Sequence, residues 1–401
     1  MNTIHSICII TYAFPYDGIP LQPFVEQLVN TFVDMGLRCD VVVPRSITNS
    51  IVRKIKLPSK AYRAVTQKRN PYNVYFPRYF SISTAGGPFG GFFEWFNWNA
   101  FTRAAKRAVH TRQIEPDAFY GHFFNPSGLT SAVLSAMYDK PYYVACGENS
   151  FASLDKMGPA WVKGKLKGIA GVVAVSGNNK KELVSRGYVS GEKVEVFVNA
   201  IDTDLFYPRD KAEMRKKYQI GEDVFIVCFV GRFLEVKGPR RLAAALDQID
   251  EVYSVFLGTD AEYPSCKNIL FCGSVPHSQV PEYLSLADVF VLPTLAEGCC
   301  NAIIEAMACG LPVISSDLPF NDDILDGDCS IRIDTRDVEA IREAIVRLRD
   351  DKALRQSMAS AALKKVESLS LSRRAERILQ FMEGQVNDGK SIGHNAGVQL
   401  R

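Results

Sequence analysis

Two glutamates, Glu297 and Glu305, stand eight residues apart in the second half of the chain. An apolar run over 287–293 precedes them and predicts a short buried strand, followed by a tight turn and a helix that carries Glu305. Paired carboxylates can act as a general acid and a general base, as in glycoside hydrolysis, or can accept hydrogen bonds from sugar hydroxyl groups. Because α/β proteins bind ligands where parallel strands end, we expect this segment to carry the chemistry.

A second group of candidate residues follows the apolar run 224–230, which predicts a strand buried on both faces. Gly231 allows a tight turn, and Arg232 and Lys237 could converge on one anion. Two fixed cations stabilise a leaving diphosphate because they neutralise its charge. The alternative is a pair of solvated bases in a surface turn. Their position after a strand, together with the acids downstream, favours the functional interpretation.

The turn between the two acids predicts a phosphate site. Backbone N–H groups at the start of a helix have no partner within the helix, and the helix dipole attracts negative charge. We therefore expect phosphate oxygens to bind the backbone of this turn, at Gly298, Cys299, Cys300, Asn301 and Ala302. Glu305 could then accept hydrogen bonds from ribose hydroxyl groups, and Glu297 from a sugar. The alternative for Glu305 is an ordinary surface position on the helix.

The elements that must position these residues alternate between strands and helices in both halves of the chain. This alternation predicts an α/β fold of two Rossmann-like domains, over 1–204 and 205–368, that face each other across a cleft. A last helix is expected over 369–384, and the polar, glycine-rich stretch 385–401 is expected to be disordered. Residues 44–90 are predicted to form a long irregular segment.

Composition narrows the class of protein. A chain of 401 residues with 47% hydrophobic and 23% charged residues can build an ample core and is typical of a soluble globular protein. Its ten cysteines include no C-x-x-C pair, so we expect buried reduced thiols, no metal site and a cytoplasmic location. No apolar run is long enough to span a membrane, and residues 1–10 are typical of a buried strand rather than a signal peptide.

Charge is distributed unevenly along the chain. Residues 1–208 carry 23 Lys and Arg and 15 Asp and Glu, hence +8, whereas the remainder carries 24 and 29, hence −5. The segment 41–93 contains nine bases and no acid, and a cluster of aromatic residues follows over 89–101. Bases beside Trp and Phe make residues 45–101 a candidate contact with an anionic membrane surface, on the inner face of the cell membrane. The alternative is a solvated basic loop beside a core helix. Nucleic acid is not expected, because no binding motif for it accompanies the charge.

These motifs resemble those of the retaining glycosyltransferases with the GT-B fold, glycosyltransferase family 4, of the bacterial surface-polysaccharide type. The E-x7-E motif of that family matches Glu297 and Glu305, and its G-R-x-x-x-x-K-G motif matches Gly231, Arg232, Lys237 and Gly238. Its hinge pattern matches, with Ala200 in place of glycine, at Asn199, Ile201, Asp202, Phe206 and Pro208. The resemblance covers nearly the whole chain and is more specific in the C-terminal half.

The resemblance implies transfer of a sugar from a UDP- or GDP-sugar, with retention, to a lipid-linked saccharide or a related acceptor in surface polysaccharide synthesis. It implies that the C-terminal domain binds the donor, that the N-terminal domain binds the acceptor, and that neither a metal nor another cofactor takes part. It also implies that the C-terminal helix crosses back to the first domain. Arg232 and Lys237 would neutralise the diphosphate, Glu297 would bind the donor sugar, and Glu305 the ribose.

In the first domain the resemblance implies that His122 lies near the donor sugar and that Ser176 lies at the cleft, although a lone histidine is more often structural. The loop over 14–25 departs from the family, since Gly18 is its one glycine where many relatives carry a Gly-Gly turn that faces the diphosphate. Gly18 is therefore the candidate phosphate contact of this loop. The D-x-D sequence Asp202-Thr203-Asp204 falls in the predicted hinge and is interpreted as turn chemistry without a metal.

Two other classes of function stay open from the sequence. One is a nucleotide-binding oxidoreductase with two Rossmann-like domains, although G-x-G-x-x-G is missing after the first predicted strand. The other is a non-catalytic subunit of polysaccharide assembly that uses the same fold, although its acids and bases are intact.

Overall fold

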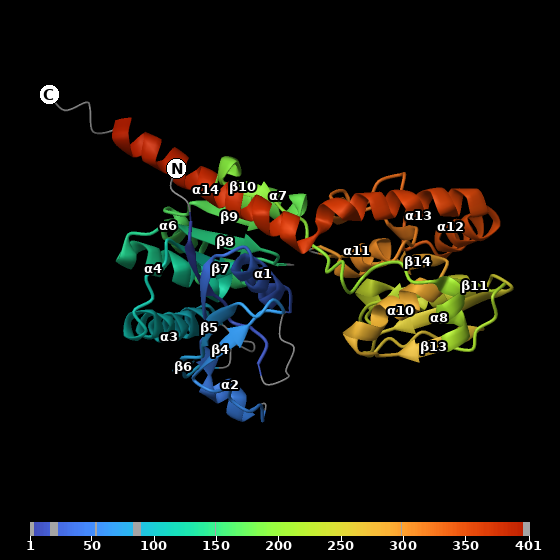
Figure 1. Ribbon diagram of the computed structural model, residues 1–401, viewed down its shortest axis with the longest axis horizontal. Helices are drawn as coiled ribbons and strands as arrows, with labels where there is room; N and C mark the ends of the chain where they lie inside the picture. Colours follow the sequence, from blue (N-terminus) through green and yellow to red (C-terminus); the bar gives the residue numbers. More distant parts are fainter. Residues whose placement is uncertain are drawn as a thin grey trace. The chain divides into compact units, whose positions relative to one another are not determined.

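The structure is a computed structural model that describes residues 4–16, 23–52, 54–82, 90–148, 150–297 and 299–395. The chain divides into two compact units. Unit 1 comprises the chain up to Phe197 together with the part from Arg374 onward, and unit 2 comprises Val198–Arg373. The domain boundary at 204/205 predicted from the sequence lies a few residues after this division. Each unit is a Rossmann-like α/β domain and is described separately below (Figure 1).

Unit 1 is built on a sheet whose described strands follow the order β10-β9-β8-β7-β1-β2-β5-β4, with only the β4–β5 pair antiparallel. These strands are β1 (Ser6–Ile10), β2 (Arg38–Val42), β4 (Ala61–Val65), β5 (Pro71–Tyr75), β7 (Ala118–His122), β8 (Tyr142–Cys146), β9 (Gly171–Ala174) and β10 (Val194–Val196). A separate pair of short parallel strands joins β3 (Arg45–Ser46) to β6 (Arg78–Tyr79).

Helices cover both faces of this sheet, and the alternation within β1 shows why. Its five residues are all buried; Cys8 and Ile10 pack into one core cluster, and Ile7 and Ile9 into another. A strand buried on both faces therefore appears as a continuous apolar run in the sequence. The first cluster contains side chains of α3 (Gly90–Thr111), α4 (Leu129–Tyr138), α5 (Ala152–Met157), α6 (Pro159–Leu166) and α7 (Gly177–Ser185). The second contains side chains of α1 (Pro23–Asp34) and α14 (Leu371–Asn395).

The prediction of a long irregular segment over 44–90 is wrong for most of its described residues. This stretch forms β3, α2 (Ile47–Val52), β4, β5 and β6. Tyr72, Val74 and Phe76 are buried and alternate with less buried residues, because β5 extends the sheet beside β2 while β4 closes a hairpin against β5. The many bases of the segment obscure this period of two, which is the ordinary signal of a strand.

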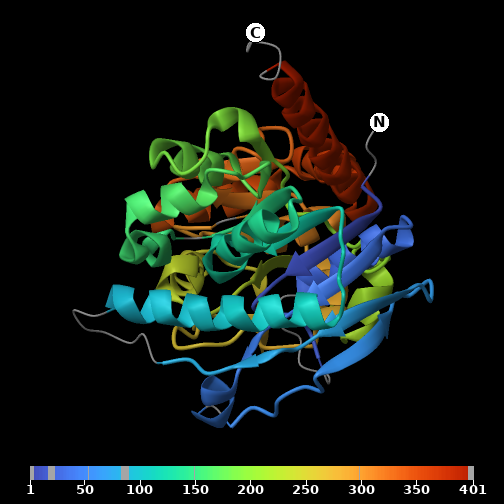
Figure 2. The ribbon, with the colours of Figure 1, turned by 90° about the vertical axis from the view of Figure 1, so that its left-hand side faces the viewer.

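The aromatic cluster over 89–101 serves partly as core and is partly exposed. Trp98 and Phe101 are buried against the sheet, whereas Phe92 is 60% exposed and Trp95 is 44% exposed. Phe89 lies outside the described residues. The cyan helix α3 lies on the outside of unit 1 in Figure 2. Its C-terminal part packs against the sheet, whereas its N-terminal part exposes aromatic rings to solvent.

Unit 2 is built on a parallel sheet whose described strands follow the order β13-β12-β11-β14-β15-β16. The strands are β11 (Phe225–Val230), β12 (Val252–Leu257), β13 (Ile269–Gly273), β14 (Val289–Leu292), β15 (Val313–Ser316) and β16 (Ser330–Ile333). The helices are α8 (Lys211–Lys217), α9 (Pro239–Leu246), α10 (Val280–Leu286), α11 (Asn301–Ala308), α12 (Val338–Asp350) and α13 (Lys352–Val366). Aspartate side chains cap α8, α12 and α13 by accepting hydrogen bonds from first-turn N–H groups.

The C-terminal helix α14 begins at the end of unit 2 and belongs to unit 1 from Arg374 onward, as the sequence led us to expect of a crossing helix. Ala375, Ile378 and Met382 are fully buried, and the Tyr143 hydroxyl donates to the Met382 carbonyl over 2.6 Å. The predicted helix over 369–384 and tail over 385–401 differ from this helix, which continues to Asn395. Once a helix is nucleated by packing, each further residue adds one backbone hydrogen bond, so weak helix formers can extend it.

Within the described residues, no helix combines the length and the hydropathy that a bilayer crossing requires.

Candidate active site

The most telling contact of unit 2 joins two residues predicted from the sequence: the Lys237 ammonium donates to Glu297 Oε1. Lys237 ends a single helical turn, Glu235–Lys237, that follows β11, and Glu297 lies in the loop after β14. Strands β11 and β14 are neighbours in the sheet, so their carboxyl ends bring the two loops together. The side chains are 21% and 11% exposed, so this ion pair lies in a partly dehydrated position.

Backbone contacts fix these two loops against each other. The Val236 carbonyl accepts from Leu295 N over 2.8 Å, and the Arg241 guanidinium donates to the Pro293 carbonyl over 2.8 Å. Gly238 has a φ of 75°, and a Cβ there would lie 2.6 Å from the Pro293 oxygen. The glycine that ends the G-R-x-x-x-x-K-G motif is therefore required both by its backbone conformation and by this close approach.

Arg232 is paired separately, with an acid that sequence reasoning missed. Its Nε donates to Asp260 Oδ2 over 3.0 Å, while the side chain stays 71% exposed. Asp260 follows the carboxyl end of β12, next to β11, and Gly258 allows the approach because a Cβ there would lie 1.9 Å from the Gly231 carbonyl oxygen. An inspection of polar residues after every predicted strand would have found Asp260.

Glu305 is not a surface helix residue, which removes the alternative interpretation of it. Its side chain is 12% exposed and its Oε1 lies 3.1 Å from His277 Nε2. This hydrogen bond, and then the negative charges of Glu305 and Asp202, raise the pKa of His277 above its ordinary value. The His277 ring also packs against Phe206 of the hinge pattern, with centroids 5.2 Å apart. His277 was missed because it lies in a polar connection with no apolar period around it.

The turn before α11 is held by the hinge asparagine. Asn199 Nδ2 donates to Asn301 Oδ1 over 2.7 Å, and Asn199 N donates to Cys299 Sγ over 3.4 Å. Cys300 is the N-cap of α11 but caps no N–H group with its side chain. Binding of phosphate oxygens by the backbone of this turn stays a prediction. Gly298 lies outside the described residues.

In unit 1, His122 is the last residue of β7 and is 8% exposed. Burial, and then the positive charge of Arg374, lower its pKa to about 3, so the imidazole is neutral near pH 7. The ring lies against Phe24 and Phe123, with centroids 5.5 and 4.9 Å away, and its buried Nδ1 has no hydrogen-bond partner among the described residues. A neutral ring of this kind can bind a hydroxyl group but is a weak base.

The Ser176 hydroxyl has a structural use. It caps α7 by accepting from Asn179 N over 3.2 Å, and it donates to Asn179 Oδ1 over 2.9 Å. A role for Ser176 at a ligand stays a prediction. Gly18, the candidate of the first loop, lies outside the described residues.

Glu148 is a further candidate that the sequence reasoning did not single out. It follows β8, the neighbour of β7, and its Oε1 accepts from Phe124 N over 2.6 Å. Its other carboxylate oxygen is also buried, and burial raises the pKa of the carboxyl group above its ordinary value. Asn179 links it to the Ser176 cap by donating to the Glu148 carbonyl over 2.8 Å. The carboxyl ends of β7, β8 and β9 thus place His122, Glu148 and Ser176 at one edge of the sheet.

The described residues contain no group of three or more His, Cys, Asp or Glu that could hold a metal ion. Asp202 of the D-x-D sequence accepts from Asp204 N over 3.1 Å, which is a turn contact. All ten cysteines are free thiols, and most are buried.

Comparison with known proteins finds relatives that cover most of the chain. Residues 210–365 match the family described as "Glycosyl transferases group 1". The chain is 27% identical over 374 residues to the putative teichuronic acid biosynthesis glycosyltransferase TuaC of Bacillus subtilis, an alignment that covers 90% of this chain and 93% of that protein. It is also 27% identical over 227 residues, 52% of this chain and 58% of that protein, to a UDP-Gal:alpha-D-GlcNAc-diphosphoundecaprenol alpha-1,3-galactosyltransferase of Escherichia coli.

Solved structures share the fold over nearly the full length. A sucrose-phosphate synthase from Thermosynechococcus elongatus superposes with a TM-score of 0.71 at 18% identity, covering 96% of this chain and 100% of that chain. Anabaena Alr3699/HepE in complex with UDP-glucose superposes with a TM-score of 0.66 at 15% identity, covering 94% and 99%. The two Rossmann-like units therefore form a GT-B fold, and the family match over unit 2 supports a glycosyltransferase of this fold.

Proposed function

We propose that this protein transfers a sugar, with retention, from a nucleotide-sugar donor to a lipid-linked saccharide or related acceptor in bacterial surface polysaccharide synthesis. The observation that carries the proposal is the Lys237–Glu297 pair, held at the carboxyl ends of two neighbouring strands of unit 2. The similarity to TuaC and to the diphosphoundecaprenol galactosyltransferase supports the acceptor class, and the match to group 1 supports the reaction class. The assignment to family 4 rests on the two motifs.

Each residue of the site receives a role in this proposal. Lys237 and Arg232 neutralise the donor diphosphate, with Glu297 orienting the Lys237 ammonium and accepting a hydrogen bond from a donor-sugar hydroxyl. Glu305 accepts hydrogen bonds from the ribose, and the backbone N–H groups before α11 hold phosphate oxygens. His122 and Glu148 belong to unit 1, where neutral or hydrogen-bonded side chains would bind sugar hydroxyl groups.

The proposed step is a front-face displacement. The acceptor hydroxyl oxygen bonds to the anomeric carbon on the face from which the diphosphate departs, while the bond between that carbon and the diphosphate oxygen breaks. The hydroxyl proton passes to the departing phosphate oxygen. Negative charge on the diphosphate grows as the bond breaks, so fixed cations beside it stabilise the transition state more than the ground state.

No metal takes part in this proposal, because two side-chain cations do the work that a metal ion does in other transferases. We expect EDTA to leave turnover unchanged and added Mg²⁺ to raise it by no more than about twofold. A loss of turnover in EDTA that Mg²⁺ restores would contradict this part of the proposal.

A donor panel tests the proposed function. The purified chain is titrated calorimetrically with UDP- and GDP-sugars and, separately, with NAD, and donor hydrolysis is followed in parallel. We expect one nucleotide sugar to bind and to be slowly hydrolysed, with binding weakened in Lys237→Ala. Binding of NAD alone would favour an oxidoreductase, and binding without any product on a panel of saccharide and lipid-linked acceptors would favour a non-catalytic assembly subunit.

The acceptor class places the reaction at the inner face of the cell membrane, and the basic and aromatic segment 45–101 supplies a surface for this contact. Phe92 and Trp95 are exposed on α3. A peripheral membrane position therefore forms part of the proposal.

A further inference from the structure

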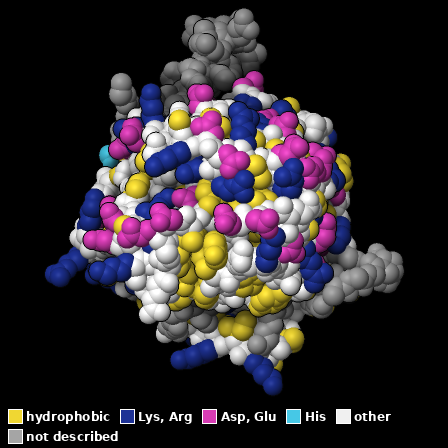
Figure 3. Space-filling view, turned by 90° about the vertical axis from the view of Figure 1, so that its right-hand side faces the viewer, with side chains coloured by type: hydrophobic (Ala, Val, Ile, Leu, Met, Phe, Trp, Pro, Cys, Tyr) yellow, Lys and Arg dark blue, Asp and Glu magenta, His cyan; other side chains and the backbone are white. Residues whose placement is uncertain are grey.

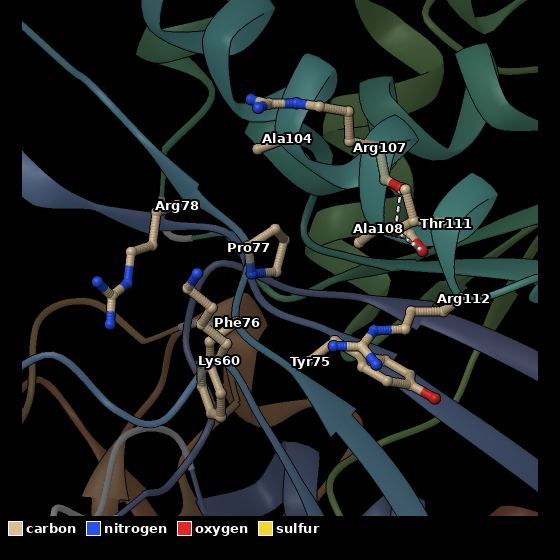
Figure 4. Close-up of a pocket in the computed structure, with 10 residues that line it drawn as sticks. All are labelled: Lys60, Tyr75, Phe76, Pro77, Arg78, Ala104, Arg107, Ala108, Thr111 and Arg112. Atoms are coloured by element: carbon tan, nitrogen blue, oxygen red, sulfur yellow. Dashed lines mark hydrogen bonds between the residues drawn. The ribbon is translucent and has the colours of Figure 1, made fainter.

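Unit 1 contains a hollow that has no part in the proposed donor chemistry. It lies between the end of β5 with the following residues and the C-terminal part of α3, and its volume is about 460 Å³. Its walls include the apolar side chains of Phe76, Pro77, Ala104 and Ala108, together with four bases. Figure 4 shows these bases around the hollow: Arg107 and Arg112 come from the α3 side, and Lys60 and Arg78 from the strand side.

The hollow carries an excess of positive charge. No acid lines it, and in the described part of the chain none of the four bases lies in an ion pair with Asp or Glu. Arg112 lies over the Tyr75 ring, 5.4 Å from its centroid, which holds its guanidinium at the wall. Asp40 does not line the hollow, but its charge and that of Arg112 both act on the Tyr75 hydroxyl, so Asp40 offsets part of the positive charge on this side.

The backbone that carries two of the bases is fixed. Phe76 N donates to the Lys60 carbonyl over 2.8 Å, and Arg45 N donates to the Pro77 carbonyl over 2.8 Å, so Lys60 and Arg78 stand on hydrogen-bonded strands. Arg107 stands on the long helix α3, whose Ala104 and Ala108 are buried. Rigid elements therefore hold like charges around one concave surface, and this arrangement focuses a positive potential.

A contrasting surface shows that such segregation is not general in this protein. On the face of unit 2 shown in Figure 3, Lys and Arg side chains are interspersed with Asp and Glu. Bases of unit 2 form ion pairs with nearby acids, as Lys267 does with Asp250. The hollow differs from this mixed face in that bases line it and acids do not.

We propose that this hollow is a binding pocket for a phosphate-bearing group, either the headgroup of an anionic lipid or the phosphate of a soluble phosphorylated saccharide. Guanidinium groups match phosphate oxygens in geometry, and the ammonium of Lys60 adds a point charge. A volume of about 460 Å³ exceeds that of a bare phosphate, and the apolar wall suits an organic group attached to it. None of the residues that line the pocket is among those assigned to the donor site.

The test compares two double variants of the full chain. Arg78→Gln/Arg107→Gln removes one base from each wall of the pocket, and Arg336→Gln/Lys352→Gln removes two exposed bases of unit 2 as a matched control. Binding to vesicles of phosphatidylcholine with and without phosphatidylglycerol is measured by co-sedimentation. Binding of inorganic pyrophosphate is measured by calorimetry in the Lys237→Ala background, so that the proposed donor site contributes little.

We expect the chain to bind phosphatidylglycerol vesicles, pyrophosphate or both, and the pocket variant to bind about tenfold or more weakly, since it lacks two charged donors. The control variant should stay within about twofold. Binding to vesicles alone would identify a lipid headgroup as the source, and binding to pyrophosphate would identify a free phosphate group. No binding to either probe, or equal weakening in both variants, would overturn the proposal. Unchanged donor hydrolysis in the pocket variant would show that it is folded and would keep this outcome separate from the proposed function.

Discussion

Replacement of Lys237 by methionine removes the ammonium group and keeps most of the side-chain volume. The structure places that ammonium on Glu297 Oε1, with 21% and 11% of the two side chains exposed. Loss of one transition-state donor of this kind costs about 10²–10³ in turnover, or ~2.7–4 kcal/mol. We therefore expect Lys237→Met to lower kcat by about this factor.

The same change leaves the Glu297 carboxylate without its cation. Breaking a fully buried pair costs about 3–5 kcal/mol and an exposed pair about 0.2–1 kcal/mol, so a loss of about 1–3 kcal/mol in the free energy of unfolding suits this intermediate burial. Steady-state kinetics and urea unfolding measure the two effects. In Lys237→Met/Glu297→Gln the stability loss should be smaller than the sum of the single losses, because the charges are removed together.

A matched control breaks an exposed pair of the same unit. Lys267 and Asp250 are 41% and 92% exposed, so Lys267→Met should leave the free energy of unfolding close to that of the parent and turnover unchanged. Turnover of folded Lys237→Met within about threefold of the parent, or a stability loss no larger than that of Lys267→Met, would contradict these roles of Lys237.

Three further predictions follow from other contacts. The pKa of His277 is raised in the folded state, so the hydrogen bond between His277 and Glu305 stabilises the fold fully at pH values below the unfolded pKa. This stabilisation is lost as the pH rises through the folded pKa. In urea unfolding, His277→Asn should therefore show a weaker pH dependence than the parent above about pH 6.5. Burial raises the pKa of Glu148, so the folded protein loses stability as the pH rises above the ordinary pKa of a glutamate. Glu148→Gln should therefore raise the free energy of unfolding at pH 7. An equal or lower free energy of unfolding would contradict this. A Cβ at Gly258 would lie 1.9 Å from a backbone oxygen, so Gly258→Ala should destabilise unit 2 by about 1–3 kcal/mol in thermal unfolding, whereas Gly327→Ala, with open space around it, should change little.

The sequence predicted the parts of this protein whose signals are local. Continuous apolar runs such as 224–230 identified buried parallel strands, and glycines and bases directly after them identified Lys237 and Arg232. The pairing of Lys237 with Glu297 follows from strand order, since β14 lies beside β11 although β12 and β13 intervene in the chain.

Other features depend on tertiary placement and gave no local signal. Asp260 and His277 stand in polar connections, and only the fold brings them to Arg232 and Glu305. The hairpin of β4 and β5 was missed because bases interrupt its period of two. Glu148 was missed because an acid two residues after a strand is common, and only its burial distinguishes it.

The anomeric configuration of the product tests the central claim most directly. A donor that binds is incubated with the purified chain and a saccharide or lipid-linked acceptor, and the new linkage is followed by proton NMR from the first turnovers. We expect a linkage with the same anomeric configuration as the donor, which the parent chain forms and which Lys237→Met forms about 10²–10³ times more slowly. An inverted linkage, or a retained linkage formed equally fast without Lys237, would contradict it.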